Sequence, residues 1–273
     1  MQIRLLYQTT PMNVITYVMH KFYCLAQCAG KVTHRNDLQR VYELRDLLPD
    51  PVPPGAYFAN FDETLTSYAV KKKVFLEIEE DLQGLDHDAW AFLKKELAPL
   101  LTAKDPDRGW QQLIDKLNQA KGYNHVKHLG CTDVRFIPES RMKGHRTPDI
   151  EAVDGNRAIL CEVKTINLSN NEVVRFRSGG VGASADRLSE AFLGKLRSTV
   201  DGAEQQMLVY NADKRTRRIA YLVINFDDTL HEYADQYAPQ LEEVAAGYLA
   251  RGIEVVYDTG GGSEQLRPSS PHF

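Results

Sequence analysis

Two charged side chains interrupt an apolar run in the middle of the chain. Residues 158–166 read AILCEVKTI, and Glu162 and Lys164 are the charged members of this run. A short, nearly continuous apolar run is typical of a buried strand. Since side chains alternate between the two faces of a strand, Glu162 and Lys164 share one face. A charge is costly to bury unless it is paired or bound to a cation, so these residues mark a candidate site.

A second acidic group precedes this run. Residues 147–153 read TPDIEAV and predict another strand, in which Asp149 and Glu151 share a face. The Asp154-Gly155 pair that follows is a two-residue hairpin signal. A hairpin at this point would pair the two strands and bring their acidic side chains together.

Carboxylates crowded in this way favour a bound cation. Close carboxylates repel each other, and one of them tends to take up a proton unless a positive charge is present. Hard oxygen ligands suit Mg²⁺ or Mn²⁺. Such an ion can activate a water molecule and neutralise charge on a phosphate. Lys164 would orient that water or stabilise the charge that develops on the phosphate.

The same residues form a pattern with a known counterpart. Pro148-Asp149 followed by Glu162-Val163-Lys164 resembles the PD-(D/E)xK nuclease superfamily. Gln206 and Tyr210, in QMLVY, resemble the Q-x-x-x-Y motif of the recombination-exonuclease branch. They are four residues apart and so would lie on one face of a helix.

The resemblance covers residues 110–257 and implies a role for each matching residue. It implies that the catalytic residues are Asp149, Glu162 and Lys164. It implies that the metal ligands are Asp149, Glu162 and the main-chain carbonyl of Val163. It also implies that Gln206 and Tyr210 line the site and contact the substrate backbone.

One feature of the superfamily is missing. Many members carry a glutamate on the helix before the first strand, where this chain offers Gln111, Gln112 and Asp115. Glu151 is a further candidate ligand that would compensate. The choice between one metal ion and two therefore stays open.

Basic residues flank the candidate site in the sequence. They gather in 141–146, RMKGHR, and in 214–218, KRTRR. Arg146 in the first cluster and Arg187 beyond the Gly-rich loop 178–184 are candidate substrate-binding residues, because arginine and lysine supply most contacts to nucleic-acid phosphates.

The expected function is hydrolysis of DNA phosphodiester bonds in repair, recombination or defence against foreign DNA, with Mg²⁺ or Mn²⁺ as cofactor. The resemblance implies 3′-hydroxyl and 5′-phosphate products. Two alternatives remain: a non-catalytic nucleic-acid-binding protein on a decayed nuclease fold, and an interaction module whose N-terminal region binds protein. The sequence leaves open exonuclease or endonuclease action, DNA or RNA, and whether the protein forms a homodimer.

The elements needed to position these residues give an α/β fold class. We expect a restriction-endonuclease-like core with a mixed central sheet flanked by helices at 107–260, a mostly helical N-terminal region at 1–106 and a flexible tail at 261–273. The Pro-rich run 49–55 suggests a boundary. Helices are expected near 12–28, 36–48, 66–82, 86–101, 110–121, 185–210 and 233–250, and strand material at 126–136, 147–153, 158–166, 219–226 and 253–257.

Composition is consistent with this description. The chain has 273 residues, a net charge of −4 and 26% charged residues, so a nucleic-acid surface would have to be local. No apolar stretch reaches the length of about 20 residues that a membrane helix needs. The four cysteines are not required to hold a chain of this size together. We therefore expect a cytoplasmic protein with no membrane partner.

Three other motifs give weaker signals. NFDETL at 60–65 and NFDDTL at 225–230 have Asn where a haloacid-dehalogenase phosphatase needs its nucleophilic Asp. His125, His128 and Cys131 have a zinc-like spacing but lack the second cysteine pair of a structural site. The loop SGGVGAS lacks the Gly-Lys-Ser/Thr ending of a P-loop. We therefore expect structural roles for the first two and a flexible lid from the third.

Overall fold

The computed structural model describes residues 35–106, 108–140, 142, 146–166, 187–224 and 234–259. The expected helix at 12–28, the loop 178–184, the second copy of the NFD motif, the tail and most of the basic cluster 141–146 lie outside these residues. Among the described helices, none is long and apolar enough to cross a membrane.

The chain divides into two compact units. A helical unit comprises Met1–Gln83 and Ala98–Gly109, and a sheet unit comprises Gly84–Leu97 and Trp110–Phe273. The segment 84–97 thus groups with the sheet, although it precedes the boundary at 106/107 that we expected from the sequence. All candidate site residues belong to the sheet unit.

The helical unit is built around aromatic side chains. Its described helices are η1 (Arg35–Leu38), α2 (Gln39–Arg45), α3 (Phe61–Ser67), α4 (Ala69–Gln83) and η2 (Ala98–Thr102). Phe61 contacts the rings of Tyr42, Phe58 and Phe75 edge-on at centroid distances of 5.1, 5.1 and 4.9 Å. These contacts join α2, α3 and α4, and the expected mostly helical N-terminal region is confirmed for its described part.

A buried carboxylate begins α2. The residue before this helix, Leu38, cannot cap it with a side chain. Glu79, on the later helix α4, caps α2 instead: it accepts hydrogen bonds from Arg40 N at 3.0 Å and Val41 N at 2.8 Å. Gln83 donates to the same carboxylate at 2.5 Å. Glu79 therefore has a structural role, because the first N–H groups of a helix need external acceptors.

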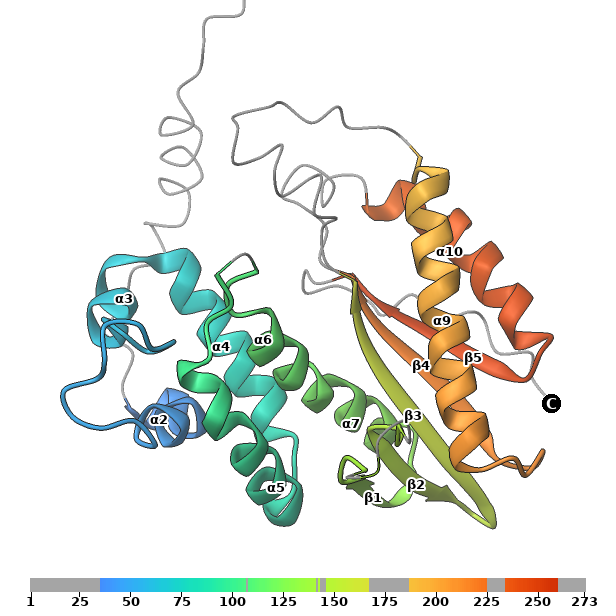
Figure 1. Ribbon diagram of the computed structural model, residues 1–273, viewed down its shortest axis with the longest axis horizontal. Helices are drawn as coiled ribbons and strands as arrows, with labels where there is room; N and C mark the ends of the chain where they lie inside the picture. The colour runs from blue at the N-terminus through green and yellow to red at the C-terminus, as the bar shows by residue number, and fades with distance from the viewer. Residues whose placement is uncertain are drawn as a thin grey trace, which may run out of the picture. The chain divides into compact units, whose positions relative to one another are not determined.

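The sheet unit contains a five-stranded mixed sheet, in the order β1-β2-β3-β4-β5 (Figure 1). The strands are β1 (Thr132–Phe136), β2 (Ile150–Asp154), β3 (Arg157–Ile166), β4 (Arg217–Ile224) and β5 (Ile253–Asp258). The first three are antiparallel, and β3, β4 and β5 are parallel. The expected α/β fold with a mixed sheet is thus confirmed.

The expected hairpin joins β2 and β3. Asp154 pairs with Arg157, so the turn consists of Gly155 and Asn156, one residue later than the Asp-Gly signal suggested. Gly155 has a positive φ of 59°, which glycine adopts without strain. This turn fixes the register that places the acidic side chains of the two strands.

Helices cover both faces of the sheet. Helices α9 (Glu190–Tyr210) and α10 (Ala234–Leu249) lie side by side on one face (Figure 1). They form an apolar core with alternate residues of β3, β4 and β5, among them Leu160, Leu222 and Val255. Helix α7 (Gln119–His128) packs on the other face, near α6 (Gln111–Leu117) and α5 (His87–Leu97).

Two expectations on this second face are wrong. The predicted helix 110–121 is two helices that meet at Asn118, and the predicted strand material from Val126 is the end of α7. Strand β1 begins at Thr132, after Gly130 with a φ of 82°. The buried side of α7 combines Tyr123 and Val126 with the small residues Ala120 and Gly122 and with His125, so small and polar residues interrupt the apolar pattern by which a helix is recognised.

Candidate active site

Asp149 and Glu162 meet where β2 and β3 separate. The ladder between the strands ends at the pair Ile150 and Cys161, and Asp149 and Glu162 are the next residues on the two strands. The carbonyl of Asp149 accepts a hydrogen bond from Ile137 N at 2.9 Å, just beyond β1. The backbone of Asp149 is therefore fixed, and its side chain is free to turn toward β3.

Both oxygens of the Asp149 carboxylate accept a hydrogen bond. Val163 N donates to Oδ2 at 2.8 Å, and Gln119 Nε2 donates to Oδ1 at 2.6 Å. The two donors come from β3 and from the first residue of α7. Asp149 is thus anchored to the sheet and to the helix above it.

The position of Gln119 follows from two contacts of its helix. Asn118 Nδ2 donates to Thr165 Oγ1 of β3 at 3.0 Å, which fixes the start of α7 over the strand. Gly122, three residues after Gln119, lies so close to Val163 that a Cβ added to the glycine would be 2.4 Å from Val163 Cγ2. Helix α7 can approach β3 this closely because it has no side chain at Gly122.

Glu162 is held from the opposite face of the sheet. Its side chain is 1% exposed and forms an ion pair with Lys164, which is 33% exposed. Gln206 Nε2, in the last two turns of α9, donates to Glu162 Oε2 at 3.0 Å. The Glu162 carboxylate therefore has a cationic partner on its own strand and a neutral donor on the covering helix.

Ionising both Asp149 and Glu162 is unfavourable without a further positive charge. Burial, and next the charge of Asp149, raise the pKa of Glu162 to about 8, although Lys164 opposes the shift. Burial also raises the pKa of Asp149, against the opposing effects of the Val163 N–H and Lys164. A second positive charge would remove the cost of ionising both carboxylates.

Gln206 uses its amide protons inside the protein. Its Nε2 donates to Thr147 O at 2.5 Å as well as to Glu162. A primary amide carries two N–H groups, so both are engaged. A phosphodiester offers acceptors and no donors, so the free protein presents no Gln206 proton to a phosphate. The structure gives Gln206 a role in fixing Glu162, and the contact with substrate that the sequence suggested stays a prediction.

Glu151 lies on β2, two residues after Asp149, and Tyr210 lies on α9, one turn after Gln206. The Glu151 carboxylate accepts from Arg135 Nε at 2.8 Å, so it is already paired on β1. Burial, followed by the charge of Glu151, raises the pKa of Tyr210, which is 40% exposed. Glu151 thus lies in a surface group with Arg135 and Tyr210, and its role as a further metal ligand stays a prediction.

The remaining candidate residues are placed as follows. The N–H of Val163 points toward Asp149, and in a strand the N–H and C=O of one residue point to the same side. Arg146 is exposed beside Thr147, whose carbonyl accepts from Gln206. Arg187 is exposed just before α9, whereas Gln206 lies near its end, about 24 Å along the axis at the usual helical rise. Arg187 is therefore remote from Glu162.

The cluster 214–218 is largely engaged within the protein. Arg217 pairs with Glu254 at 2.7 Å, and Arg215 pairs with Asp213 at 2.8 Å. Arg218 is buried and donates to the carbonyls of Asn211 and Asp213, both at 2.8 Å. These arginines hold the turn before β4, so the phosphate-binding role suggested for this cluster does not fit Arg218.

Asp149 and Glu162 are the acidic ligands that the site offers to a cation. Within the part of the chain that is described, no three His, Cys, Asp or Glu side chains form a group that would hold a metal ion. The rings of His125 and Tyr221 are tilted by 47° with their centroids 5.3 Å apart, and Cys131 is a buried free thiol. The structural role expected for His125 is consistent with this packing.

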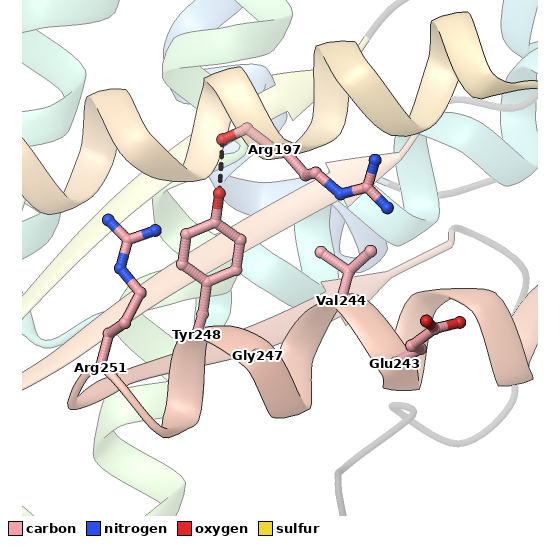
Figure 2. Close-up of a pocket in the computed structure, with 6 residues that line it drawn as sticks. All are labelled: Arg197, Glu243, Val244, Gly247, Tyr248 and Arg251. Atoms are coloured by element: carbon pink, nitrogen blue, oxygen red, sulfur yellow. Dashed lines mark hydrogen bonds between the residues drawn. The ribbon is translucent and has the colours of Figure 1, made fainter.

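Two hollows in the sheet unit lie away from the site and are not lined by Asp149 or Glu162. A groove of about 260 Å³ between α9 and α10 is lined by Arg197, Tyr248 and Arg251 with neighbouring α10 residues (Figure 2). Tyr248 Oη donates to Arg197 O at 2.9 Å, and Arg251 pairs with acidic residues of α9. The second hollow, of about 350 Å³, lies between α5 and β1. The groove in Figure 2 is thus a helix-packing feature.

Sequence reasoning missed the residues that position Asp149 and Gln206 from neighbouring segments. Gln119 and Asn118 fall at a helix junction that the pattern did not reveal, and Thr147 contributes a main-chain carbonyl. One signal was available: Asn118 and Gln119 are adjacent polar residues at the start of α7. Comparison with protein-family models and with curated proteins finds no match for the chain.

Proposed function

We propose that this chain is a divalent-cation-dependent nuclease that hydrolyses phosphodiester bonds of DNA. The observation that carries the proposal is the pair of carboxylates of Asp149 and Glu162, held together beside Lys164 by donors from both faces of the sheet. A carboxylate such as Glu162, whose pKa is raised by burial and by the charge of a neighbouring carboxylate, is typical of functional sites, and burial raises the pKa of Asp149 as well.

The donor set suits a hard divalent cation. Two carboxylates and a main-chain carbonyl, that of Val163, supply oxygen ligands, and water would complete the coordination. Neither a thiolate nor an imidazole belongs to the described site, which favours Mg²⁺ or Mn²⁺ over zinc. When bound, such an ion would activate water and neutralise phosphate charge.

Lys164 supplies the other charge needed for phosphoryl chemistry. Its ammonium bonds to Glu162, and the Lys164 side chain is 33% exposed, so it can also reach a bound phosphate. A lysine at this position can donate to a phosphate oxygen as negative charge develops on it. Gln119 and Gln206 hold the two carboxylates in place while this occurs.

The order of elements also supports the proposal. Helix α7 precedes an antiparallel β1-β2-β3, and α9 leads to the parallel strand β4. A restriction-endonuclease-like core has this arrangement, and its acidic residues lie on the second and third strands. Asp149, just before β2, and Glu162, within β3, are consistent with that arrangement. Fold alone does not determine activity, so the site residues carry the argument.

A cleavage assay tests the proposal. The full-length protein is incubated with labelled linear, circular and single-stranded DNA, and with RNA, in Mg²⁺, Mn²⁺ or EDTA. We expect cleavage of DNA with the metal and none in EDTA. If the protein binds DNA but cuts nothing, the alternative of a non-catalytic binding protein on a decayed nuclease fold is correct.

Variants separate the roles within the site. Asp149→Asn should abolish both metal binding and cleavage, because it removes a charged ligand. Lys164→Met should retain metal binding, and cleavage should fall by at least about a hundredfold, since one oriented donor is typically worth that much. Asp88→Asn and Lys95→Met make the same charge changes at exposed positions of α5 and should behave as the parent. Unchanged cleavage by Lys164→Met would contradict the mechanism.

A further inference from the structure

The Gln119 side chain lies directly beside the Asp149 carboxylate. Its amide lies 2.6 Å from Asp149 Oδ1, closer to that carboxylate than Val163 N at 2.8 Å is to Oδ2. The group that faces this carboxylate is the amide nitrogen, which donates to it. Position 119 therefore contributes a donor to Asp149 and no negative charge to the site.

The neighbouring acidic residues are engaged elsewhere. Glu151 pairs with Arg135 at 2.8 Å, and Glu139 pairs with Lys116 at 3.1 Å. The described site thus holds the charges of Asp149 and Glu162, offset in part by Lys164. One divalent cation brings this buried group close to neutrality with a bound phosphodiester. A second ion would leave uncompensated positive charge in a buried place, which is costly.

We propose that Gln119 is a positioning residue that orients Asp149, and that as a neutral amide in this place it limits the site to a single divalent cation. This inference rests on the proposed function, since it concerns the cation that the nuclease would use. Gln119 acts through Asp149 and touches neither substrate nor reacting atoms. Its own position is set by Asn118 and Gly122, which fix α7 on β3.

Counting bound Mn²⁺ tests the proposal without reference to activity. Mn²⁺ is titrated into the full-length protein, and the free ion is measured by electron paramagnetic resonance. The parent should bind one Mn²⁺ per chain at the site. Gln119→Glu supplies a third carboxylate beside Asp149 and should bind two. Gln112→Glu, the same change at an exposed position of α6, should bind one with the parent's Kd.

A neutral variant tests the positioning role. Gln119→Leu removes the donor to Asp149 and leaves the carboxylate count unchanged. It should still bind one Mn²⁺, with a Kd raised about tenfold, the usual effect of losing a residue that orients a ligand. Circular dichroism checks that the variant is folded. If it is not, the stoichiometries of the parent and of Gln119→Glu decide the question.

The outcomes distinguish this inference from the proposed function. Two Mn²⁺ per parent chain, or one per chain in Gln119→Glu with an unchanged Kd, would overturn the inference even if the protein cleaves DNA. An unchanged Kd in folded Gln119→Leu would overturn the positioning role. A parent that binds no Mn²⁺ would overturn the proposed function, and this inference with it.

Discussion

Gly122 of α7 lies so close to Val163 of β3 that a Cβ added to the glycine would be 2.4 Å from Val163 Cγ2 and 3.2 Å from Ile150 Cδ1. Val163 and Ile150 directly adjoin the site residues Glu162 and Asp149. This close helix–sheet approach near the site is therefore made at a residue with no side chain. The spacing at Gly122 determines how far Gln119 stands from the carboxylate it holds.

Replacement of Gly122 by Ala should destabilise the sheet unit. The methyl group meets β-branched side chains that cannot move aside easily, and overpacking of this kind costs about 1–3 kcal/mol. Urea unfolding followed by circular dichroism measures the loss. Gly194→Ala, at an exposed position of α9 with nothing within 4 Å, should instead stabilise the protein by about 0.5–1 kcal/mol. A neutral Gly122→Ala would contradict the close packing.

Loss of the Glu79 carboxylate should destabilise the helical unit. Glu79→Ala leaves the Arg40 and Val41 N–H groups at the start of α2 without their acceptor, at a cost of about 1–3 kcal/mol for each one buried. Glu79→Gln keeps one acceptor oxygen and should lose less. Differential scanning calorimetry gives the change in Tm. Glu80→Ala, the exposed neighbour, should have the parent's Tm, and an equal loss in both would argue against the capping role.

The strands of the site could be predicted because their patterns are local. An apolar run interrupted at alternate positions by Glu162 and Lys164 predicts both the strand and the shared face, and Gly155 indicates the turn. The mixed sheet followed from the order of these segments along the chain. These features depend on residues a few positions apart, so the sequence reveals them directly.

Contacts between distant segments could not be predicted in this way. The hydrogen bond from Gln119 to Asp149 joins residues 30 apart, and that from Gln206 to Glu162 joins residues 44 apart. Strand alternation predicts that Glu151 and Asp149 share a face, but the hydrogen-bond partner of Glu151 is Arg135 of the neighbouring strand β1. The sequence pattern identifies which side chains share a face, and the packing of neighbouring elements determines their partners.

Tyr210 should contribute to DNA binding through its ring. Tyr210 is 40% exposed one turn beyond Gln206 and lies near Arg135, and an exposed aromatic ring near a guanidinium suits an unpaired base. Tyr210→Ala should raise KM for single-stranded DNA about fivefold to tenfold, as expected for one lost base-stacking contact. Tyr210→Phe should be close to the parent, because it keeps the ring.

The control for this prediction is the adjacent residue. Val209 is 60% exposed on the same turn, and Val209→Ala should leave KM unchanged. Metal affinity should be the same in all three variants, since Tyr210 is not among the residues around Glu162. A fall in kcat with an unchanged KM in Tyr210→Ala would instead place the residue in the chemical step.

Stability of the metal-free protein should fall as pH rises from about 5 to about 8. Glu162 has an ordinary pKa near 4.5, and burial and the charge of Asp149 raise it to about 8 in the folded protein. Below the lower value the group is protonated in both states, and its stabilising contribution is fully present. As pH rises, the unfolded chain loses the proton first, so the free energy of unfolding decreases until the folded pKa is passed.

Binding of Mg²⁺ should show the opposite pH dependence. A cation competes with the proton that Glu162 retains, so the Kd for Mg²⁺ should decrease as pH rises from 6 to about 8 and then level off. Thermal unfolding in EDTA and in saturating Mg²⁺ at several pH values measures both effects. Glu162→Gln should remove most of the pH dependence in EDTA and weaken the response to Mg²⁺, whereas Glu80→Gln should preserve both. A parent whose Tm in EDTA is flat from pH 5 to 8 would show that Glu162 is already ionised without a cation, and would remove the electrostatic basis for placing one between Asp149 and Glu162.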